Sequence, residues 1–195
     1  MPRPLAVAIT GGIGAGKSEA LQAFRKAGAA TVSSDEIVHH LLRSNEDVKE
    51  AIVGELGDGV LDESGVIDRR RVGEIVFGDR GKLDFLEGLL HPLVSAEYLR
   101  WRDQLGELPN PPQVCVTEVP LLYETGGNER FDKVVVITAP DKLREQRRRV
   151  TRDDRDQRLL PDKEKVRRAD FAYVNTGTLD ELDEWVAGVM RELTA

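Results

Sequence analysis

Several features that define other classes of protein are scarce in this sequence. Cys115 is the single cysteine among 195 residues, so no disulfide can form within the chain. It lies in the apolar run Val114–Thr117, which predicts a buried core thiol rather than a nucleophile. No apolar run approaches the roughly 20 residues of a membrane-spanning helix, and the first residues lack the apolar centre of a signal peptide. We therefore expect no membrane contact and a cytoplasmic location.

Basic residues are outnumbered by acidic residues. The chain carries 28 lysines and arginines against 35 acidic residues, a formal net charge of −7. This balance argues against non-specific binding to nucleic acid, although a local basic patch is compatible with it. The guanine-recognition pattern Asn-Lys-x-Asp is absent, and Asp62-x-x-Gly65 is interpreted as a turn. His39 and His40 have no partners at ligand spacing, so no metal is assigned to them.

The sequence does contain a phosphate-binding loop in the context that such a loop requires. Leu5–Ile9 is an apolar run of strand length, and Gly11-x-x-x-x-Gly16-Lys17-Ser18 follows it. A helical pattern comes next, carried by Ala20, Leu21, Phe24 and Ala27. Strand, loop and helix in this order are typical of a P-loop that binds a nucleoside triphosphate. The alternative is a glycine-rich turn that binds nothing, and it leaves the Lys-Ser pair at this spacing unexplained.

Each residue type in the loop has a direct chemical reason. The glycines let successive backbone N–H groups turn toward one anion. The helix that begins near Gly16 adds the partial positive charge of its N-terminus. Lys17 supplies a full positive charge for the terminal phosphates, and the Ser18 hydroxyl is placed to ligate Mg²⁺.

Two acidic residues follow other predicted strands. Asp35 comes just after the strand Ala30–Ser33, and Glu118 ends the strand that begins at Gln113. Ligands of open α/β sheets bind at the carboxyl ends of the strands, so Asp35 is expected at the same crevice as the loop. It could accept the proton of a substrate hydroxyl or cap the following helix, and the spacing alone does not decide between them. Glu118 is either oriented toward Mg²⁺ and its waters or exposed at a strand end.

The organisation of the chain follows from where strands occur. The strands 133–138 and 171–174 complete an α/β fold, a P-loop NTPase with a three-layer α/β/α core around a mostly parallel five-stranded sheet. We assign residues 1–44 and 109–195 to this nucleotide-binding core. Helical patterns dominate residues 45–108, which we predict as an insertion that holds the acceptor substrate. Within it, Pro92 must either kink a helix or open a new one.

An arginine-rich segment follows the fourth strand. Residues 144–158 carry many arginines among acids and almost no apolar side chains after Val150. A solvated helix surface accounts for such a run about as well as a lid does. In a P-loop kinase this is the place where a lid brings arginines onto the transferring phosphate, and we predict a short lid over residues 144–165.

Motifs beyond the loop occur in a characteristic order. They are Thr10-Gly-Gly-Ile-Gly-Ala-Gly-Lys-Ser18, Asp35-Glu-Ile37, Leu61-Asp-Glu-Ser-Gly-Val-Ile-Asp-Arg69, Val76-Phe77, Leu86-Glu87, His91-Pro92, Val119-Pro-Leu-Leu-Tyr-Glu124, Ala169-Asp170 and Asn175-Thr-Gly177. Together they resemble the dephospho-CoA kinase family over essentially the whole chain. The P-loop is shared with other small-molecule kinases, whereas the His-Pro and Pro-Leu-Leu-aromatic-Glu motifs make the resemblance specific.

The resemblance implies ATP-dependent phosphorylation of the ribose 3′-hydroxyl of dephospho-CoA, the last step of coenzyme A biosynthesis, with ATP and dephospho-CoA as the partners. It implies Asp35 as the general base, Lys17 as the phosphate clamp, Ser18 as the Mg²⁺ ligand, and Arg152 with Arg148 as lid arginines. The residues expected to bind ATP are Gly12, Ile13, Gly14, Ala15, Gly16, Lys17, Ser18, Glu19 and, near the adenine, Asn175. Besides Asp35, those expected on the acceptor side are Thr10, Arg69, His91, Leu121 and Glu124.

The chain also departs from the family's usual pattern. Ser33 stands where the family usually has an acid, and Glu118 stands where it usually has Asp. The segment between Arg152 and Ala169 is shorter than usual. Two alternatives therefore stay open: a kinase for another small acceptor, such as a nucleotide or sugar, and a nucleotide-dependent switch module. A monomer is the default expectation.

Overall fold

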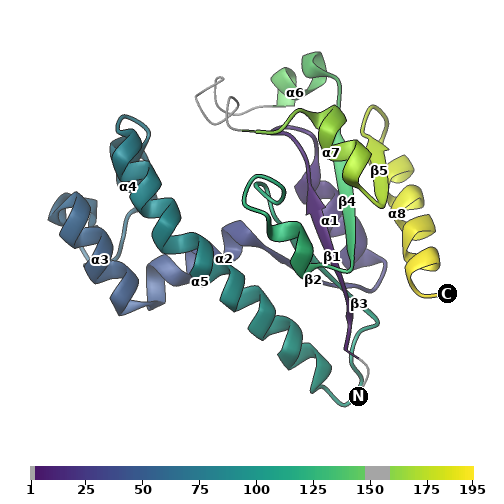
Figure 1. Ribbon diagram of the computed structural model, residues 1–195, viewed down its shortest axis with the longest axis horizontal. Helices are drawn as coiled ribbons and strands as arrows, with labels where there is room; N and C mark the ends of the chain where they lie inside the picture. The colour runs from purple at the N-terminus through teal and green to yellow at the C-terminus, as the bar shows by residue number, and fades with distance from the viewer. Residues whose placement is uncertain (1–2, 148–158) are drawn as a thin grey trace. The chain divides into compact units, whose positions relative to one another are not determined.

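A five-stranded parallel sheet organises the larger part of the molecule. The computed structural model describes residues 3–147 and 159–195 (Figure 1). The strands are β1 (Leu5–Thr10), β2 (Ala30–Ser33), β3 (Val114–Glu118), β4 (Lys133–Thr138) and β5 (Phe171–Val174). Their order across the sheet is β2-β3-β1-β4-β5, and each neighbouring pair is parallel. The predicted α/β class and the five strands are confirmed, and the sheet is entirely rather than mostly parallel.

The order of the strands places a ligand crevice beside β1. From β1 the chain builds β2 and β3 on one side and then β4 and β5 on the other. Such a reversal is the topological switch point at which open α/β sheets bind ligands, at the carboxyl ends of the strands. Ile9 and Ser33 both pair with Glu118, so β1, β2 and β3 end at the same edge. The P-loop therefore begins at the switch point.

Helices cover both faces of the sheet, because successive side chains of each strand point to opposite faces. On one face, Val7 and Ile9 of β1 pack with apolar residues of α1 (Lys17–Lys26) and α8 (Leu179–Leu193). Figure 1 shows these two helices side by side. On the other face, Ala8 packs with residues of segment 119–131, which includes η2 (Gly127–Arg130), and of α7 (Asp162–Arg168). Helix α6 (Asp141–Arg147) also belongs to the larger unit.

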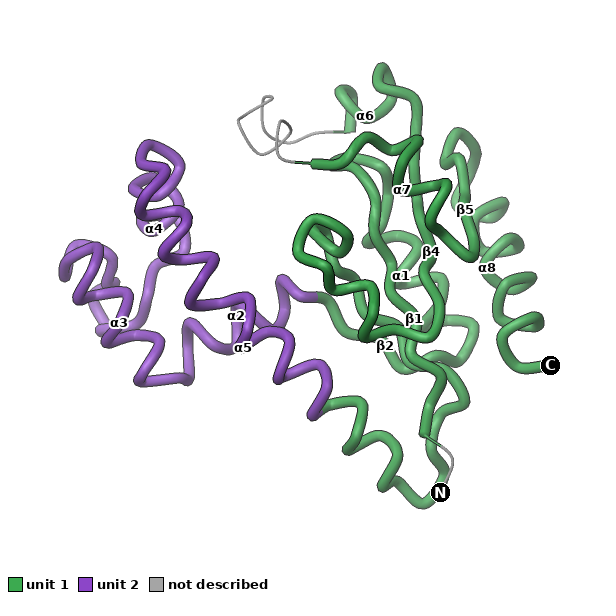
Figure 2. The backbone as a smooth tube through the Cα atoms, in the orientation of Figure 1, with its two compact units in different colours: residues 1–33, 101–195 green, residues 34–100 purple. Residues whose placement is uncertain are grey.

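The described chain divides into two compact units (Figure 2). The larger unit comprises residues 1–33 and 101–195, and the helical unit comprises residues 34–100. The helical unit contains α2 (Ser34–Ser44), α3 (Glu46–Leu56), η1 (Asp58–Val60), α4 (Arg69–Val76) and most of α5 (Arg80–Gly106). It has its own core of buried side chains, formed by Leu42, Val48, Ile52, Val60, Ile67, Val72, Val76 and Leu90.

The bounds of the helical unit differ from the predicted insertion at 45–108. The unit starts at Ser34 because α2 follows β2 directly and its Leu42 joins the helical core. It ends at Arg100 because the last turns of α5 bond to the larger unit, where Arg102 Nη1 donates to the carbonyl of Arg130 at 3.0 Å. Helix α5 also continues through Pro92, so the alternative in which Pro92 opens a new helix is wrong.

Candidate active site

The loop between β1 and α1 adopts a backbone that residues with a side chain rarely adopt. Gly11, Gly14 and Gly16 have φ angles of 148°, 75° and 95°. The space beside them is also occupied: a Cβ on Gly11 would lie 1.9 Å from the carbonyl oxygen of Ile137, and one on Gly16 would lie 2.1 Å from Nδ2 of Asn175. The glycines of the motif are therefore required by conformation and by close packing at once.

The loop leads into α1 with its first N–H groups uncapped by a side chain. Gly16 is the N-cap residue, and it has no side chain that could accept from the first turn. Lys17 Nζ donates to the carbonyl of Gly12 at 3.1 Å, so the ammonium folds back over the loop. Backbone donors, a helix N-terminus and a lysine thus converge on one place, which is the arrangement that binds a phosphate.

The side-chain amide of Asn175 is hydrogen-bonded to the loop. Its Nδ2 donates to the carbonyl of Ala15 at 2.9 Å, and the side chain is buried. The peptide carbonyl of Ala15 is thereby held on the side away from the N–H of Gly16, because the two groups share one planar peptide unit and point in opposite directions. The structure places Asn175 against the ATP-binding loop that the sequence predicts.

Ser18 and Glu118 meet across the switch point. The Ser18 hydroxyl donates to Glu118 Oε2 at 3.4 Å. No group of three or more His, Cys, Asp or Glu that could hold a metal ion occurs among residues 3–147 and 159–195. Mg²⁺ in kinases is bound by one or two protein oxygen ligands together with substrate phosphates and water. A hydroxyl and a carboxylate beside a phosphate-binding loop are therefore a donor set that fits Mg²⁺.

Thr10 and Glu124, predicted on the acceptor side, make contacts within the larger unit. Thr10 is fully buried, and its hydroxyl donates to the carbonyl of Pro120 at 3.2 Å. Glu124 Oε1 accepts from the N–H of Leu160 at 2.8 Å and lies 2.8 Å from Nζ of Lys165. Lys165 has no exposed surface, and the sequence reasoning missed it because a lysine in a highly charged helix reads as solvated surface.

Asp35, Arg69 and His91 lie in the helical unit. Asp35 is exposed. It is the second residue of α2 and does not precede the helix, so the alternative role as the N-cap of that helix does not hold. Arg69 is the first residue of α4, next to the capping Asp68. His91 is a half-buried residue inside α5.

Two further predicted residues, Leu121 and Glu19, lie in the larger unit. Leu121 is half-buried in the segment that follows β3. Glu19 is an exposed residue in the first turn of α1. The lid arginines Arg148 and Arg152 lie outside the described residues.

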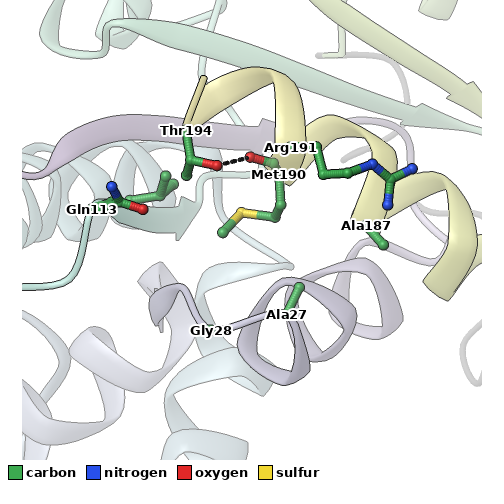
Figure 3. A pocket seen from close by; sticks show the side chains of 8 residues that line it. Ala27, Gly28, Gln113, Ala187, Met190, Arg191 and Thr194 are labelled. Carbon is green, nitrogen blue, oxygen red and sulfur yellow. Dashed lines mark hydrogen bonds between the residues drawn. The ribbon is translucent and has the colours of Figure 1, made fainter.

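A pocket of about 400 Å³ opens at the other edge of the sheet (Figure 3). It is lined by the end of α1, the start of β3 and the end of α8, where the Thr194 hydroxyl donates to the carbonyl of Met190 at 2.8 Å. None of the predicted site residues lines it. Across residues 3–147 and 159–195, no helix combines the length and the apolar character needed to cross a membrane.

Comparisons with known proteins agree with this geometry. Residues 5–181 match the family model described as dephospho-CoA kinase. A dephospho-CoA kinase of Aquifex aeolicus is 34% identical over 96% of this chain and 97% of that protein. Among solved structures, a Thermus thermophilus protein superposes with a TM-score of 0.77 at 29% identity over the whole of both chains. The dephospho-CoA kinase of Campylobacter jejuni superposes with a TM-score of 0.71 at 27% identity over 96% of each chain. The chain thus belongs to the dephospho-CoA kinase family.

Proposed function

We propose that this protein catalyses the ATP-dependent phosphorylation of the ribose 3′-hydroxyl of dephospho-CoA, giving CoA and ADP. One observation carries the proposal. The phosphate-binding loop, with Lys17 and the Ser18–Glu118 pair, sits at the switch point of the sheet of a chain that belongs to this family. The loop indicates the nucleotide site, and membership of the family indicates dephospho-CoA as the acceptor.

The loop and Lys17 bind the β- and γ-phosphates of ATP. Lys17 Nζ, which now donates to the carbonyl of Gly12, exchanges that acceptor for phosphate oxygens. A full positive charge and a helix N-terminus then stabilise the charge that spreads over the γ-phosphoryl oxygens in the transition state. Asn175 keeps the loop in its binding conformation from the outside.

Ser18 and Glu118 would hold Mg²⁺ together with the phosphates. The bound ion would neutralise phosphate charge, as it does in P-loop enzymes generally. The hydroxyl of Ser18 is the direct ligand in this proposal, and the carboxylate of Glu118 orients the hydroxyl or the waters of the ion.

Asp35 acts as the general base toward the acceptor. Its carboxylate accepts the proton of the 3′-hydroxyl while the hydroxyl oxygen forms a bond to the γ-phosphorus. The bond from that phosphorus to the β–γ bridging oxygen breaks, and ADP leaves. The exposed position of Asp35 in the first turn of α2 leaves the carboxylate accessible to a substrate.

The remaining roles follow the family resemblance. Arg69 and His91 of the helical unit are proposed on the acceptor side, as is Leu121 of the larger unit. Thr10 is fully buried and Glu124 is paired with Lys165, so these two are proposed to support the acceptor side without touching the acceptor. The resemblance also supports the proposal of a lid over residues 144–165, of which 148–158 lie outside the described residues, with Arg148 and Arg152 stabilising charge on the transferring phosphoryl group. We propose that the protein works as a monomer in the cytoplasm, on ATP and dephospho-CoA, with neither nucleic acid nor membrane as a partner.

A panel of acceptors tests this proposal. Purified protein is incubated with ATP, Mg²⁺ and dephospho-CoA, a nucleoside, a nucleotide or a sugar, and the products are identified by mass spectrometry. The proposal expects a phosphoryl group on dephospho-CoA alone, at the 3′-position. Phosphorylation of another acceptor in its place would identify a different small-molecule kinase. Slow ATP hydrolysis at the same rate in every tube would instead favour a nucleotide-dependent switch module.

A further inference from the structure

Arg144 of α6 is largely buried against the phosphate-binding loop, although the sequence did not single it out. Only 14% of its side chain is exposed. Its Nε donates to the carbonyl of Ile13 at 3.0 Å, across 131 residues of sequence. Its Nη1 lies 3.0 Å from Asp162 Oδ2 and 3.5 Å from Asp141 Oδ1. All of these groups belong to the larger unit.

The loop and Arg144 are in tight contact. A Cβ on Gly12 would lie 2.5 Å from Nη2 of Arg144 and 2.6 Å from its Cζ. A Cβ on Gly14 would lie 2.7 Å from the backbone carbonyl oxygen of Arg144. Two glycines of the loop therefore leave room for this one residue, its side chain at Gly12 and its backbone at Gly14.

The bond to Ile13 has a consequence for the donors of the loop. The carbonyl of Ile13 and the N–H of Gly14 belong to one planar peptide unit and point in opposite directions. A guanidinium that holds the carbonyl therefore fixes the N–H of Gly14 on the side away from Arg144. Hydrogen bonds with a charged partner are about twice as strong as neutral ones, so this peptide is held firmly. Asn175 holds the next but one peptide in the same way through Ala15.

Asp162 in turn holds Arg144. Its Oδ2 accepts from the Thr138 hydroxyl at 2.6 Å as well as from Arg144 Nη1. Thr138 ends β4 and Asp162 begins α7, so the carboxylate is fixed between a strand of the sheet and a helix. The guanidinium is thereby aimed at the loop, with one nitrogen on Asp162 and another on Ile13.

We propose that Arg144, oriented by Asp162, is a positioning residue that presets the phosphate-binding loop and so determines the affinity for ATP. It acts through the backbone of the loop rather than on the phosphates, because Nε and Nη1 are already engaged by Ile13 and Asp162. The inference rests on the proposed function in one respect, namely that the loop binds ATP.

Calorimetric titration of the full-length protein with ATP and Mg²⁺ tests the inference. The variants are Arg144→Ala and Arg144→Lys, with Lys142→Ala as a matched control that removes a positive charge from an exposed position of the same helix. We expect the Kd for ATP to rise roughly tenfold or more in Arg144→Ala, the scale of a lost charged hydrogen bond. Arg144→Lys should not restore affinity, since one ammonium does not reproduce the two-nitrogen geometry. Lys142→Ala should bind like wild type.

Coupling to Asp162 gives a second readout. In an Asp162→Asn background, Arg144→Ala should weaken ATP binding by a much smaller factor than it does in wild type, because the guanidinium has already lost its orientation. In steady-state assays, the KM for ATP should rise while the KM for dephospho-CoA stays the same.

The outcomes separate the two claims. Wild type that binds ATP and an Arg144→Ala variant with the same Kd, whatever its melting temperature, would overturn the positioning role alone. A lowered melting temperature without a change in Kd would mean that Arg144 serves the fold only. Wild-type protein that binds no ATP would contradict the proposed function and this inference with it.

Discussion

Two glycines share a positive φ angle but not their surroundings. Gly16 and Gly28 have φ angles of 95° and 96°. A Cβ on Gly16 would collide with the Asn175 amide at 2.1 Å, whereas nothing lies within 4 Å of a Cβ on Gly28. The pair therefore separates the cost of a left-handed backbone from the cost of disturbing the loop.

Gly28→Ala should destabilise the protein by roughly 1–2 kcal/mol, the cost of a left-handed conformation for an L-residue, and should leave ATP affinity unchanged. Gly16→Ala carries the same backbone cost and must also displace Asn175, so we expect a larger loss of stability and a loss of ATP binding. Urea denaturation and nucleotide titration measure the two effects. Equal effects of both substitutions on ATP binding would show that the Asn175 contact is unimportant for the loop.

Cys115 offers a chemical test at the same scale. The thiol is buried in β3, and burial, together with the nearby Asp132 carboxylate, raises its pKa to about 12. Because the thiolate is the reactive form, the native protein should react very slowly with a disulfide reagent at pH 8. Unfolding in denaturant should restore ordinary reactivity. Rapid, stoichiometric labelling of the native protein would contradict the buried position that the sequence predicted and the structure shows.

Residue by residue, the sequence predicted what local spacing determines. The loop glycines, Lys17 and Ser18 form one motif, and the structure shows why Gly11 and Gly16 must be glycines. The roles of Lys17 and Ser18 stay predictions. Arg144 and Lys165 could not be found in this way. Their importance lies in contacts with Ile13 and Glu124, which are far away in the sequence and close only after folding.

A buried ion pair joins the segment after β3 to helix α7. Lys165 has no exposed surface, and its Nζ lies 2.8 Å from Glu124 Oε1. Glu124 also accepts from the N–H of Leu160, just before the same helix. Removing one partner of a buried ion pair leaves an uncompensated buried charge, which costs folding free energy. This pair therefore anchors α7 to the segment that follows β3.

Removing one member of the pair should be more harmful than removing both. Lys165→Met leaves a buried carboxylate and should cost roughly 3–5 kcal/mol of unfolding free energy. Adding Glu124→Gln should recover part of that loss, since the amide oxygen can still accept from Leu160. Lys163→Met, the same change at an exposed position of α7, is the control and should have little effect. Denaturant titrations that show Lys165→Met and Lys163→Met to be equally stable would refute the anchoring role.

The strands of the larger unit were predictable because their patterns are unambiguous. The apolar run of β4, for example, is a short buried strand of a parallel sheet in the sequence and in the structure alike. The extent of α5 was not predictable in the same way. Pro92 is normally a helix breaker, yet here the helix passes through it, and a single sequence does not reveal whether neighbouring turns compensate.

For the whole molecule, two separate cores explain the division of the chain. The larger unit is packed on both faces of its sheet, and the helical unit is packed around its own cluster. The sequence indicated a helical insertion but not where it begins, because β2 passes directly into α2 without a turn or a linker. Leu42 then commits α2 to the helical core, which only the packing reveals.

We propose that the loop binds the nucleotide and that Asp35 removes the proton of the acceptor hydroxyl. The most direct test measures CoA formation and ATP affinity together in Asp35→Asn, with Glu36→Gln, the neighbouring acid in the same first turn of α2, as the control. We expect Asp35→Asn to lower kcat by roughly a hundredfold to ten-thousandfold, the usual contribution of a general base, while the Kd for ATP stays close to the wild-type value. Near-normal turnover in Asp35→Asn would contradict the claim and remove Asp35 from the reaction.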